Sequence, residues 1–243
     1  MFKIFRHAFE HPTGQINAFQ ALILSVAGRV GAGNIAGVAV AITIGGPGAV
    51  FWMWMIGFMG MATSFFECSL AQLYKTTESD GSFRGGPAYY ISRGLNKPWL
   101  AAVFSVLLLV SFGFCFNALQ SYTVASSLQE AFGVPLPVSG VGMAMVLGAI
   151  IMGGIRRIVK VAELVVPIMA AGYFLMALVV IAMHITELPA VAVLIVKSAF
   201  GLEPAVGGGL GMAIMMGIKR GLFSNEAGLG SAPNVAAVAY VKH

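Results

Sequence analysis

Long apolar stretches alternate along the chain with short polar or glycine-rich connections. Several stretches approach the roughly 20 residues that a helix needs to cross a bilayer, whereas a membrane barrel would show short strands of alternating polarity. The pattern therefore predicts an all-α integral membrane protein in which residues 1–243 form one transmembrane domain. Six spans are expected, near residues 17–44, 49–74, 99–128, 138–153, 161–182 and 207–241.

The connections between the predicted spans differ in character. The letters GGPG at residues 45–48 predict a tight turn. Residues 75–97 predict a polar loop that contains a short amphipathic piece around the letters AYYISRGL. Residues 154–160 read as a basic connector, and residues 185–206 as a connector with a surface helix around the letters AVAVLIVKSAF.

Composition and charge placement agree with this membrane reading. Hydrophobic residues make up 58% of the chain and charged residues only 9%, against about a quarter charged in soluble domains, so the lipid bilayer is an expected partner. The net charge of +5 does not indicate nucleic acid, because nine lysines and arginines lie in the N-terminal arm and in the 75–97 and 154–160 connections, against Lys197 alone in the others. The positive-inside rule then predicts a cell-membrane protein with a cytoplasmic N-terminus.

The first span is interrupted by the letters GRVGAGN at residues 28–34. Glycine costs a helix about 1 kcal/mol relative to alanine, and irregular backbone survives at membrane depth only where protein buries it or it lines a cavity. The charge count favours a single crossing, so the interruption is expected inside the membrane. Such breaks hold anionic groups at half-helix N-termini and cations at freed carbonyls in secondary transporters, which fits a zwitterionic amino acid with sodium and makes Asn34 the side chain to test.

Of two other interpretations of this stretch, one remains open, and the other fails because its glycine spacing does not match. Gly33 and Gly37 form a GxxxG pattern, which also occurs where two spans merely pack closely. A dinucleotide-binding loop does not fit, because residues 31–37 have one residue too many for its glycine spacing and no strand precedes them. Arg29 is an intramembrane charge, and such charges usually pair. We expect a structural ion pair with Glu67 or Glu226 rather than contact with substrate.

The sixth span repeats the interruption of the first, with the letters GIKRGLFSNEAGLGSAPN at residues 217–234. Breaks at the first span and five spans later match an inverted-repeat architecture in which these two spans are symmetry mates. In the third span, Asn117, Gln120 and Thr123 share a helix face, which either joins helices or meets the substrate. We find neither a metal-ligand spacing nor a nucleophile–base set, so the sequence predicts no metal, no cofactor and no enzyme.

Four long motifs carry a family likeness: GRVGAGNIAGVAVAITIGGPGAVFWMW, GMATSFFECSLAQLYK, FRGGPAYYISRGL and RGLFSNEAGLGSAPN. Together, and in this order over essentially the whole chain, they resemble the alanine or glycine:cation symporter family. The resemblance implies a LeuT-type fold of two inverted five-helix repeats, of which this chain holds the first repeat and the sixth helix. It also implies sodium-coupled, sometimes proton-coupled, import of small neutral amino acids such as alanine and glycine by alternating access.

The resemblance also implies site residues, position by position. For the substrate these are Gly31, Ala32, Gly33, Asn34, Gln120, Phe223, Ser224 and Asn225. For the sodium ion, as coupling ion rather than cofactor, they are Ala27, Val30 and Asn34. Two positions depart from the family pattern: Ala32 stands where threonine or serine is usual, and Tyr122 stands where asparagine is common.

The family's members are about twice as long as this chain, and sodium ligands are expected from an eighth span that it lacks. We therefore expect the sequence to be a fragment or a truncated product that does not transport by itself. A truncated, non-transporting membrane subunit or remnant is the alternative to a symporter. The reading frame beyond His243 discriminates the two, because further apolar spans there favour the symporter.

Overall fold

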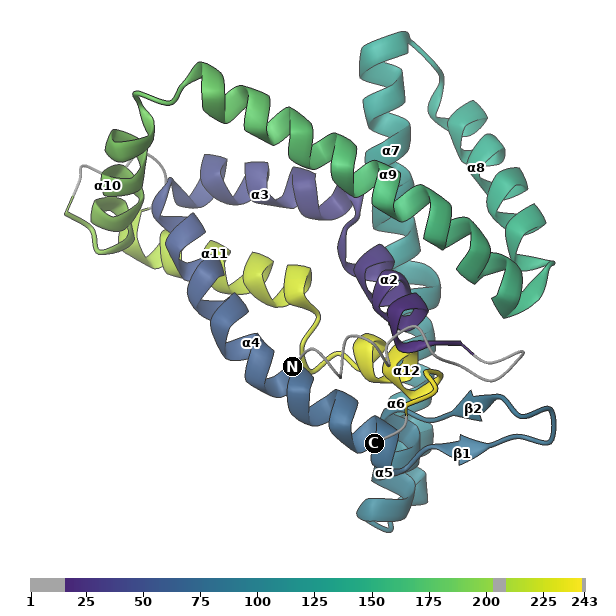
Figure 1. Ribbon diagram of the computed structural model, residues 1–243. Coiled ribbons are helices and arrows are strands. Elements are labelled where there is room, and N and C mark those ends of the chain that lie inside the picture. The colour runs from purple at the N-terminus through teal and green to yellow at the C-terminus, as the bar shows by residue number, and fades with distance from the viewer. Residues whose placement is uncertain (1–15, 203–208, 242–243) are drawn as a thin grey trace. The chain divides into compact units, whose positions relative to one another are not determined.

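The computed structural model describes residues 16–202 and 209–241, and these residues are mostly helical, which confirms the all-α prediction (Figure 1). A hairpin of two short strands is the exception within the described ranges. The helices are α2 (Ala18–Arg29), α3 (Ala32–Gly45), α4 (Gly48–Leu73), α5 (Pro87–Gly94), α6 (Pro98–Val110), the π-helix η1 (Ser111–Phe116), α7 (Asn117–Phe132), α8 (Leu136–Ile151), α9 (Gly154–Met183), α10 (Leu188–Ala199), α11 (Gly209–Asn225) and α12 (Ser231–Ala237).

Three continuous helical stretches of the described chain are long and apolar enough to cross a membrane. They are α4, the run Pro98–Phe132 that joins α6, η1 and α7, and residues Arg156–Met183 of α9. The pair α2 and α3 adds a fourth if it counts as one broken span. The 16 residues of α8 reach only about 24 Å, less than the roughly 30 Å of hydrocarbon, so the count of six spans stays a prediction.

The connections follow the sequence patterns with one difference. The turn at residues 46–47, the 188–199 helix and the amphipathic α5 all form where the sequence predicts them. Residues 154–160, read as a basic connector, instead form the first turns of α9. Arginine and lysine are good helix formers, so the charged segment continues into the apolar helix that follows it.

The chain divides into two compact units. Unit 1 comprises Met1–Gly28, Thr63–Val166 and Gly228–His243, and unit 2 comprises Arg29–Ala62 and Pro167–Ala227. In unit 2, α3 and α11 pack together, and α10 packs on α11. In unit 1, α5 packs on α6, α7 packs on α8, and α12 contacts β2.

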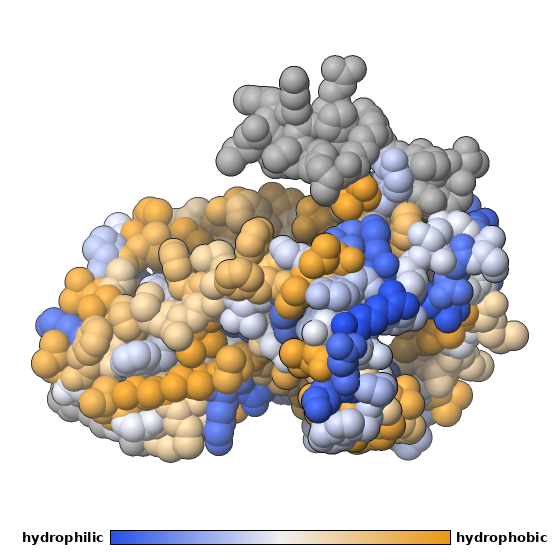
Figure 2. Space-filling model, turned by 90° about the horizontal axis from the view of Figure 1, so that it is seen from below, coloured by the Kyte–Doolittle hydropathy of each residue, from blue (hydrophilic) through white to orange (hydrophobic). Residues whose placement is uncertain are grey.

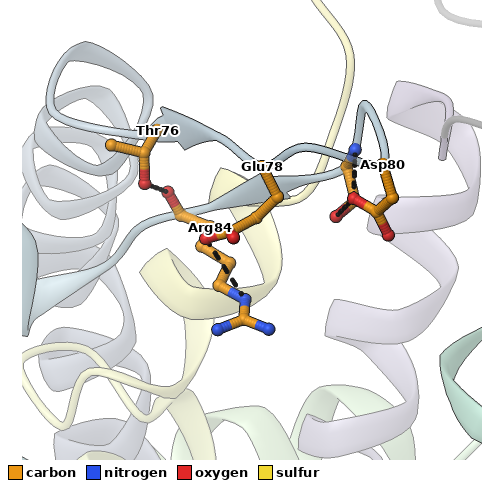
Figure 3. A network of polar contacts seen from close by, with 5 residues as sticks. Thr76, Glu78, Asp80 and Arg84 are labelled. Atoms are coloured by element: carbon orange, nitrogen blue, oxygen red, sulfur yellow. Dashed lines mark hydrogen bonds and ion pairs between the residues drawn. The ribbon is translucent and has the colours of Figure 1, made fainter.

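The 75–97 loop is ordered by a hairpin in which β1 (Thr76–Thr77) pairs antiparallel with β2 (Phe83–Arg84). Figure 3 shows its polar contacts: the Thr76 hydroxyl donates to the Arg84 carbonyl at 3.3 Å, and the Arg84 guanidinium lies 3.6 Å from the Glu78 carboxylate. The hydroxyl and the backbone N–H of Ser82 both donate to Asp80. These bonds favour the charged carboxylate and lower the pKa of Asp80.

Large apolar side chains remain exposed along many of the described helices, among them Phe65, Phe66 and Ile168, each about two-thirds exposed. Figure 2 shows hydrophobic residues gathered over much of one face. A soluble monomer rarely exposes continuous apolar patches of more than a few hundred Å². The exposed faces therefore fit contact with lipid or with further helices.

Candidate functional site

The first predicted interruption is confirmed. Helix α2 ends at Arg29 and α3 begins at Ala32, so Val30 and Gly31 lie between two helices. Gly31 is extended (φ −124°, ψ 162°) and, as a glycine at the N-cap position, provides no side-chain cap for α3. The start of α3 is the positive end of its helix dipole, where an anion is favoured.

Asn34 ties the two ends of this break together. Its Nδ2 donates a hydrogen bond to the Arg29 carbonyl, the last residue of α2. Its Oδ1 is buried and accepts no hydrogen bond from any residue that the structure describes. A buried polar atom without a partner needs an explanation such as a water or an ion. Asn34 therefore presents at the break an amide oxygen, the type of ligand that a hard cation prefers, which no described residue contacts as a donor.

The second predicted interruption is also confirmed, because α11 ends at Asn225 and α12 begins at Ser231. Three residues between them have positive φ, namely Glu226 (53°), Gly228 (86°) and Gly230 (88°). Glycine adopts this conformation without strain, whereas Glu226 adopts it at a cost. The backbone between the helices is therefore held in an irregular path.

Both ends of the Asn225 side chain take part in holding this path. Its Nδ2 donates to the Ile56 carbonyl of α4 at 3.2 Å, and its Oδ1 accepts from the Ala227 N–H at 2.9 Å. A Cβ at Gly60 would lie 2.5 Å from Asn225 Nδ2, so a side chain there would displace the amide. These bonds describe an anchor, and the contact of Asn225 with substrate stays a prediction.

Helices α3 and α11 run antiparallel through glycine contacts. A Cβ at Gly45 would meet Met212 and Met216 at 3.0 Å, and a Cβ at Gly37 would meet Arg220 at 3.0 Å. The same register, continued toward the start of α3, brings Gly33 to the level of Ser224. The positive start of α3 and the negative end of α11 are thus brought together, which suits a group carrying both charges.

A groove of about 380 Å³ lies beside this pair of helices. Its lining comes from α3, α4 and α11: Val38, Val50, Met53, Trp54, Gly57, Gly221, Ser224 and Asn225. The groove is mostly apolar with the Ser224 hydroxyl and the Asn225 amide as polar groups. Two of the predicted substrate residues, Ser224 and Asn225, therefore line this groove of unit 2. Phe223, the residue before them in α11, is half-buried.

Unit 2 holds most of the predicted site, from Arg29 to Asn34 and from Phe223 to Glu226. Ala27, Gln120 and Glu67 belong to unit 1. Glu226 is only 4% exposed, and a buried carboxylate requires charge or hydrogen-bond partners. Its predicted pairing with Arg29 stays a prediction.

Glu67 has a contact that the sequence did not predict. Its Oε2 accepts a hydrogen bond from the Gly228 N–H at 3.1 Å, in the irregular segment before α12. Burial, then the Glu67 charge and then Cys68 raise the pKa of Tyr90 in α5 to about 12. In unit 1, the Glu67 carboxylate therefore fixes the backbone of the irregular segment at Gly228 and lies near the Tyr90 phenol.

The third span contains a feature that sequence reasoning missed. Residues Ser111–Phe116 form a π-helix immediately before the polar face of α7, and such π-bulges often occur at functional sites. The Asn117 amide donates to the Gly113 carbonyl of η1, and the Thr123 hydroxyl donates to the Leu119 carbonyl of α7. Gln120 is half-buried in α7, and its role toward substrate stays a prediction. Phe112 and Phe116 stack within the π-helix at 4.5 Å.

Comparisons with known proteins identify the family to which this chain is similar. The model of the "Sodium:alanine symporter family" matches residues 1–243. The amino-acid carrier protein AlsT of Bacillus subtilis is 52% identical over 243 residues, covering 99% of this chain and 52% of that protein. The probable sodium/glutamine symporter GlnT of Bacillus subtilis is 53% identical over 228 residues, covering 94% and 48%. The sodium/alanine symporter AgcS of Methanococcus maripaludis is 42% identical over 243 residues, covering 98% and 53%.

Two conclusions follow from these matches. The resemblance inferred from the motifs is confirmed, because the family model matches the whole chain. The family and the relatives named above are symporters and carriers rather than enzymes. With its several apolar helices, the chain is a multi-pass membrane protein. The chain spans about half the length of the curated relatives that it matches.

Proposed function

The chain belongs to the sodium:alanine symporter family, and we propose that the full-length protein, residues 1–243 with any chain that follows them, couples amino-acid uptake to sodium. The names of the relatives support this proposal, since AgcS is a sodium/alanine symporter and GlnT is named for sodium and glutamine. Alanine or glycine is the proposed substrate, because a small zwitterion matches the short gap between two half-helices.

The observation that carries the proposal is the buried Asn34 Oδ1 at the break before α3, which has no hydrogen-bond partner among the residues that the structure describes. In the proposed mechanism this oxygen binds sodium, together with backbone carbonyls around Ala27 and Val30. The first N–H groups of α3, from Ala32 and Gly33, bind the substrate carboxylate. The end of α11 receives the ammonium group, because carbonyls are left without helical partners there. Bound sodium then stabilises the broken geometry that accepts substrate.

We further propose a LeuT-type inverted-repeat fold in the cell membrane, with the N-terminus cytoplasmic. Breaks in both α2–α3 and α11–α12 support this architecture, because discontinuous helices at matching positions mark the binding site of such transporters. Alternating access by movement of one bundle against the other is the expected transport mechanism. The alternative, a truncated and non-transporting subunit or remnant, is less favoured by the named carriers among the relatives.

Uptake by liposomes that contain the full-length protein tests the proposal. Labelled alanine, glycine and glutamine are each supplied with an inward sodium gradient, with equal sodium on both sides, and with an inward proton gradient alone. We expect uphill accumulation of alanine or glycine only with the sodium gradient. Equal uptake in all three conditions would exclude coupling, and accumulation driven by the proton gradient alone would replace sodium with the proton as coupling ion.

A further inference from the structure

Arg220 of α11 lies across α3 in a space that Gly37 leaves open. A Cβ at Gly37 would lie 3.0 Å from Arg220 Nη1, 3.3 Å from its Cδ and 3.4 Å from its Cζ. Both the apolar stem and the charged head of the arginine thus cross the second turn of α3. At 1.5 Å per residue, Gly37 lies about 6 Å farther along α3 than Gly33, so the guanidinium lies beside the second turn of α3, about one turn inside the half-helix start.

The guanidinium has no acidic partner in the part of the chain that the structure describes. Among the described residues its contacts are with Gly37 and with the ring of Phe223, whose centroid is 5.9 Å from Arg220 Cζ, and no carboxylate pairs with it. An arginine within a transmembrane segment normally faces the protein interior or a water-filled cavity and pairs there. The half-buried guanidinium donates no hydrogen bond to any residue that the structure describes, so its five N–H donors are available for an anion.

The position of Arg220 selects the kind of anion. It lies on α11 one turn before Ser224 and beside the face of α3 whose start is proposed to bind a carboxylate. Arginine presents a planar fork that matches a carboxylate with two parallel hydrogen bonds, which lysine does not. We propose that Arg220 binds the carboxylate of the amino-acid substrate, in a recognition subsite between α3 and α11 next to Gly37. This inference rests on the proposed symport and adds to it the residue that selects for an α-carboxylate.

Lys219 provides a matched control. It is the neighbouring cation on the same helix and is exposed, so Lys219→Gln removes the same charge without touching α3. Gly37→Ala is the second variant, because the added Cβ keeps the charge of Arg220 but displaces its head. Arg220→Lys keeps the charge and removes the fork.

The experiment measures uptake of labelled alanine by the full-length protein in liposomes, with unlabelled alanine or alaninamide as competitor. Alaninamide lacks the carboxylate, so the ratio of its inhibition constant to that of alanine reports carboxylate recognition. For Arg220→Gln we expect the KM for alanine to rise at least about tenfold, as loss of a charge-assisted bond implies, and the ratio to fall by a similar factor. Arg220→Lys and Gly37→Ala are expected to give smaller changes in the same direction, and Lys219→Gln none.

Several outcomes overturn the inference. One is an unchanged ratio of the two inhibition constants in a folded Arg220→Gln protein. If that ratio is unchanged and only thermal stability falls, Arg220 pairs with a carboxylate of the following chain, and the inference is overturned as well. If Arg220→Gln does not fold, an unchanged ratio in Gly37→Ala has the same force. Failure of the symport itself is distinguished by the unmodified protein, which would then show no sodium-driven uptake at all.

Discussion

Replacing Asn34 with alanine tests the break at the start of α3 most directly. The change removes the hydrogen bond from Nδ2 to the Arg29 carbonyl and removes the buried Oδ1 that has no partner in the described part of the chain. Leaving a buried carbonyl without its donor costs about 1–3 kcal/mol. If Oδ1 binds sodium, losing this ligand at a similar cost of about 1–3 kcal/mol corresponds to a rise of about 5- to 150-fold in the sodium concentration for half-maximal uptake.

The two roles of Asn34 are separated by a second substitution. Asn34→Asp keeps an oxygen for the cation but loses the N–H donor to the Arg29 carbonyl. We therefore expect both variants to lower the thermal unfolding temperature in detergent, whereas only Asn34→Ala weakens sodium activation. Thr43→Ala is the control, because Thr43 is exposed on the same helix and its hydroxyl donates to the Ala39 carbonyl one turn earlier.

The assay is alanine uptake by liposomes as a function of external sodium concentration. If Asn34→Ala leaves the sodium concentration for half-maximal uptake unchanged, Asn34 is not a ligand of the ion. An equal loss of sodium activation in Asn34→Ala and Asn34→Asp would leave the residue a structural role in the break and no role as an ion ligand.

Three further predictions concern packing, charge and completeness. Gly48→Ala is expected to lower the free energy of unfolding by about 1–3 kcal/mol, because its Cβ would lie 2.5 Å from backbone of α10; Gly57→Ala in the same helix, with open space around it, should not. Glu67→Gln should lower the pKa of Tyr90, now about 12, toward its usual 10. The measurement is the phenolate titration, with Tyr90→Phe as the blank, and an unchanged Tyr90 titration would contradict the proximity of Glu67 and Tyr90. Because the folded state retains the Tyr90 proton, its contribution to the free energy of unfolding falls as pH rises from about 10 to about 12. Residues 1–243 alone should not catalyse uptake, since relatives are about twice as long; sodium-driven uptake by this segment would refute that.

The sequence placed both interruptions correctly for a physical reason. Glycines clustered at residues 28–33 and 226–230 lower helix stability within otherwise apolar stretches, so the breaks are a local property that the residues themselves carry. The turn at residues 46–47 and the short helix α10 are local in the same way, since proline and glycine mark their ends. Family membership also followed from the motifs alone.

The contacts of the charged and amide side chains required the tertiary structure. The sequence offered Glu67 as a partner for Arg29, but the structure shows its carboxylate accepting the Gly228 N–H. It offered Asn225 as a substrate residue, and the structure shows its amide joining α4 to the second break. The sequence did not place Arg220, which lies against Gly37.

The difference between the two classes of result has one cause. Where a helix breaks depends on residues within a turn or two, and composition reports it. Which atom a side chain reaches depends on the antiparallel register of α3 and α11 and on glycines that admit Arg220 and Asn225, contacts between residues more than 160 positions apart. Local sequence thus determined the existence of the broken helices, and only long-range packing decided which groups face the break.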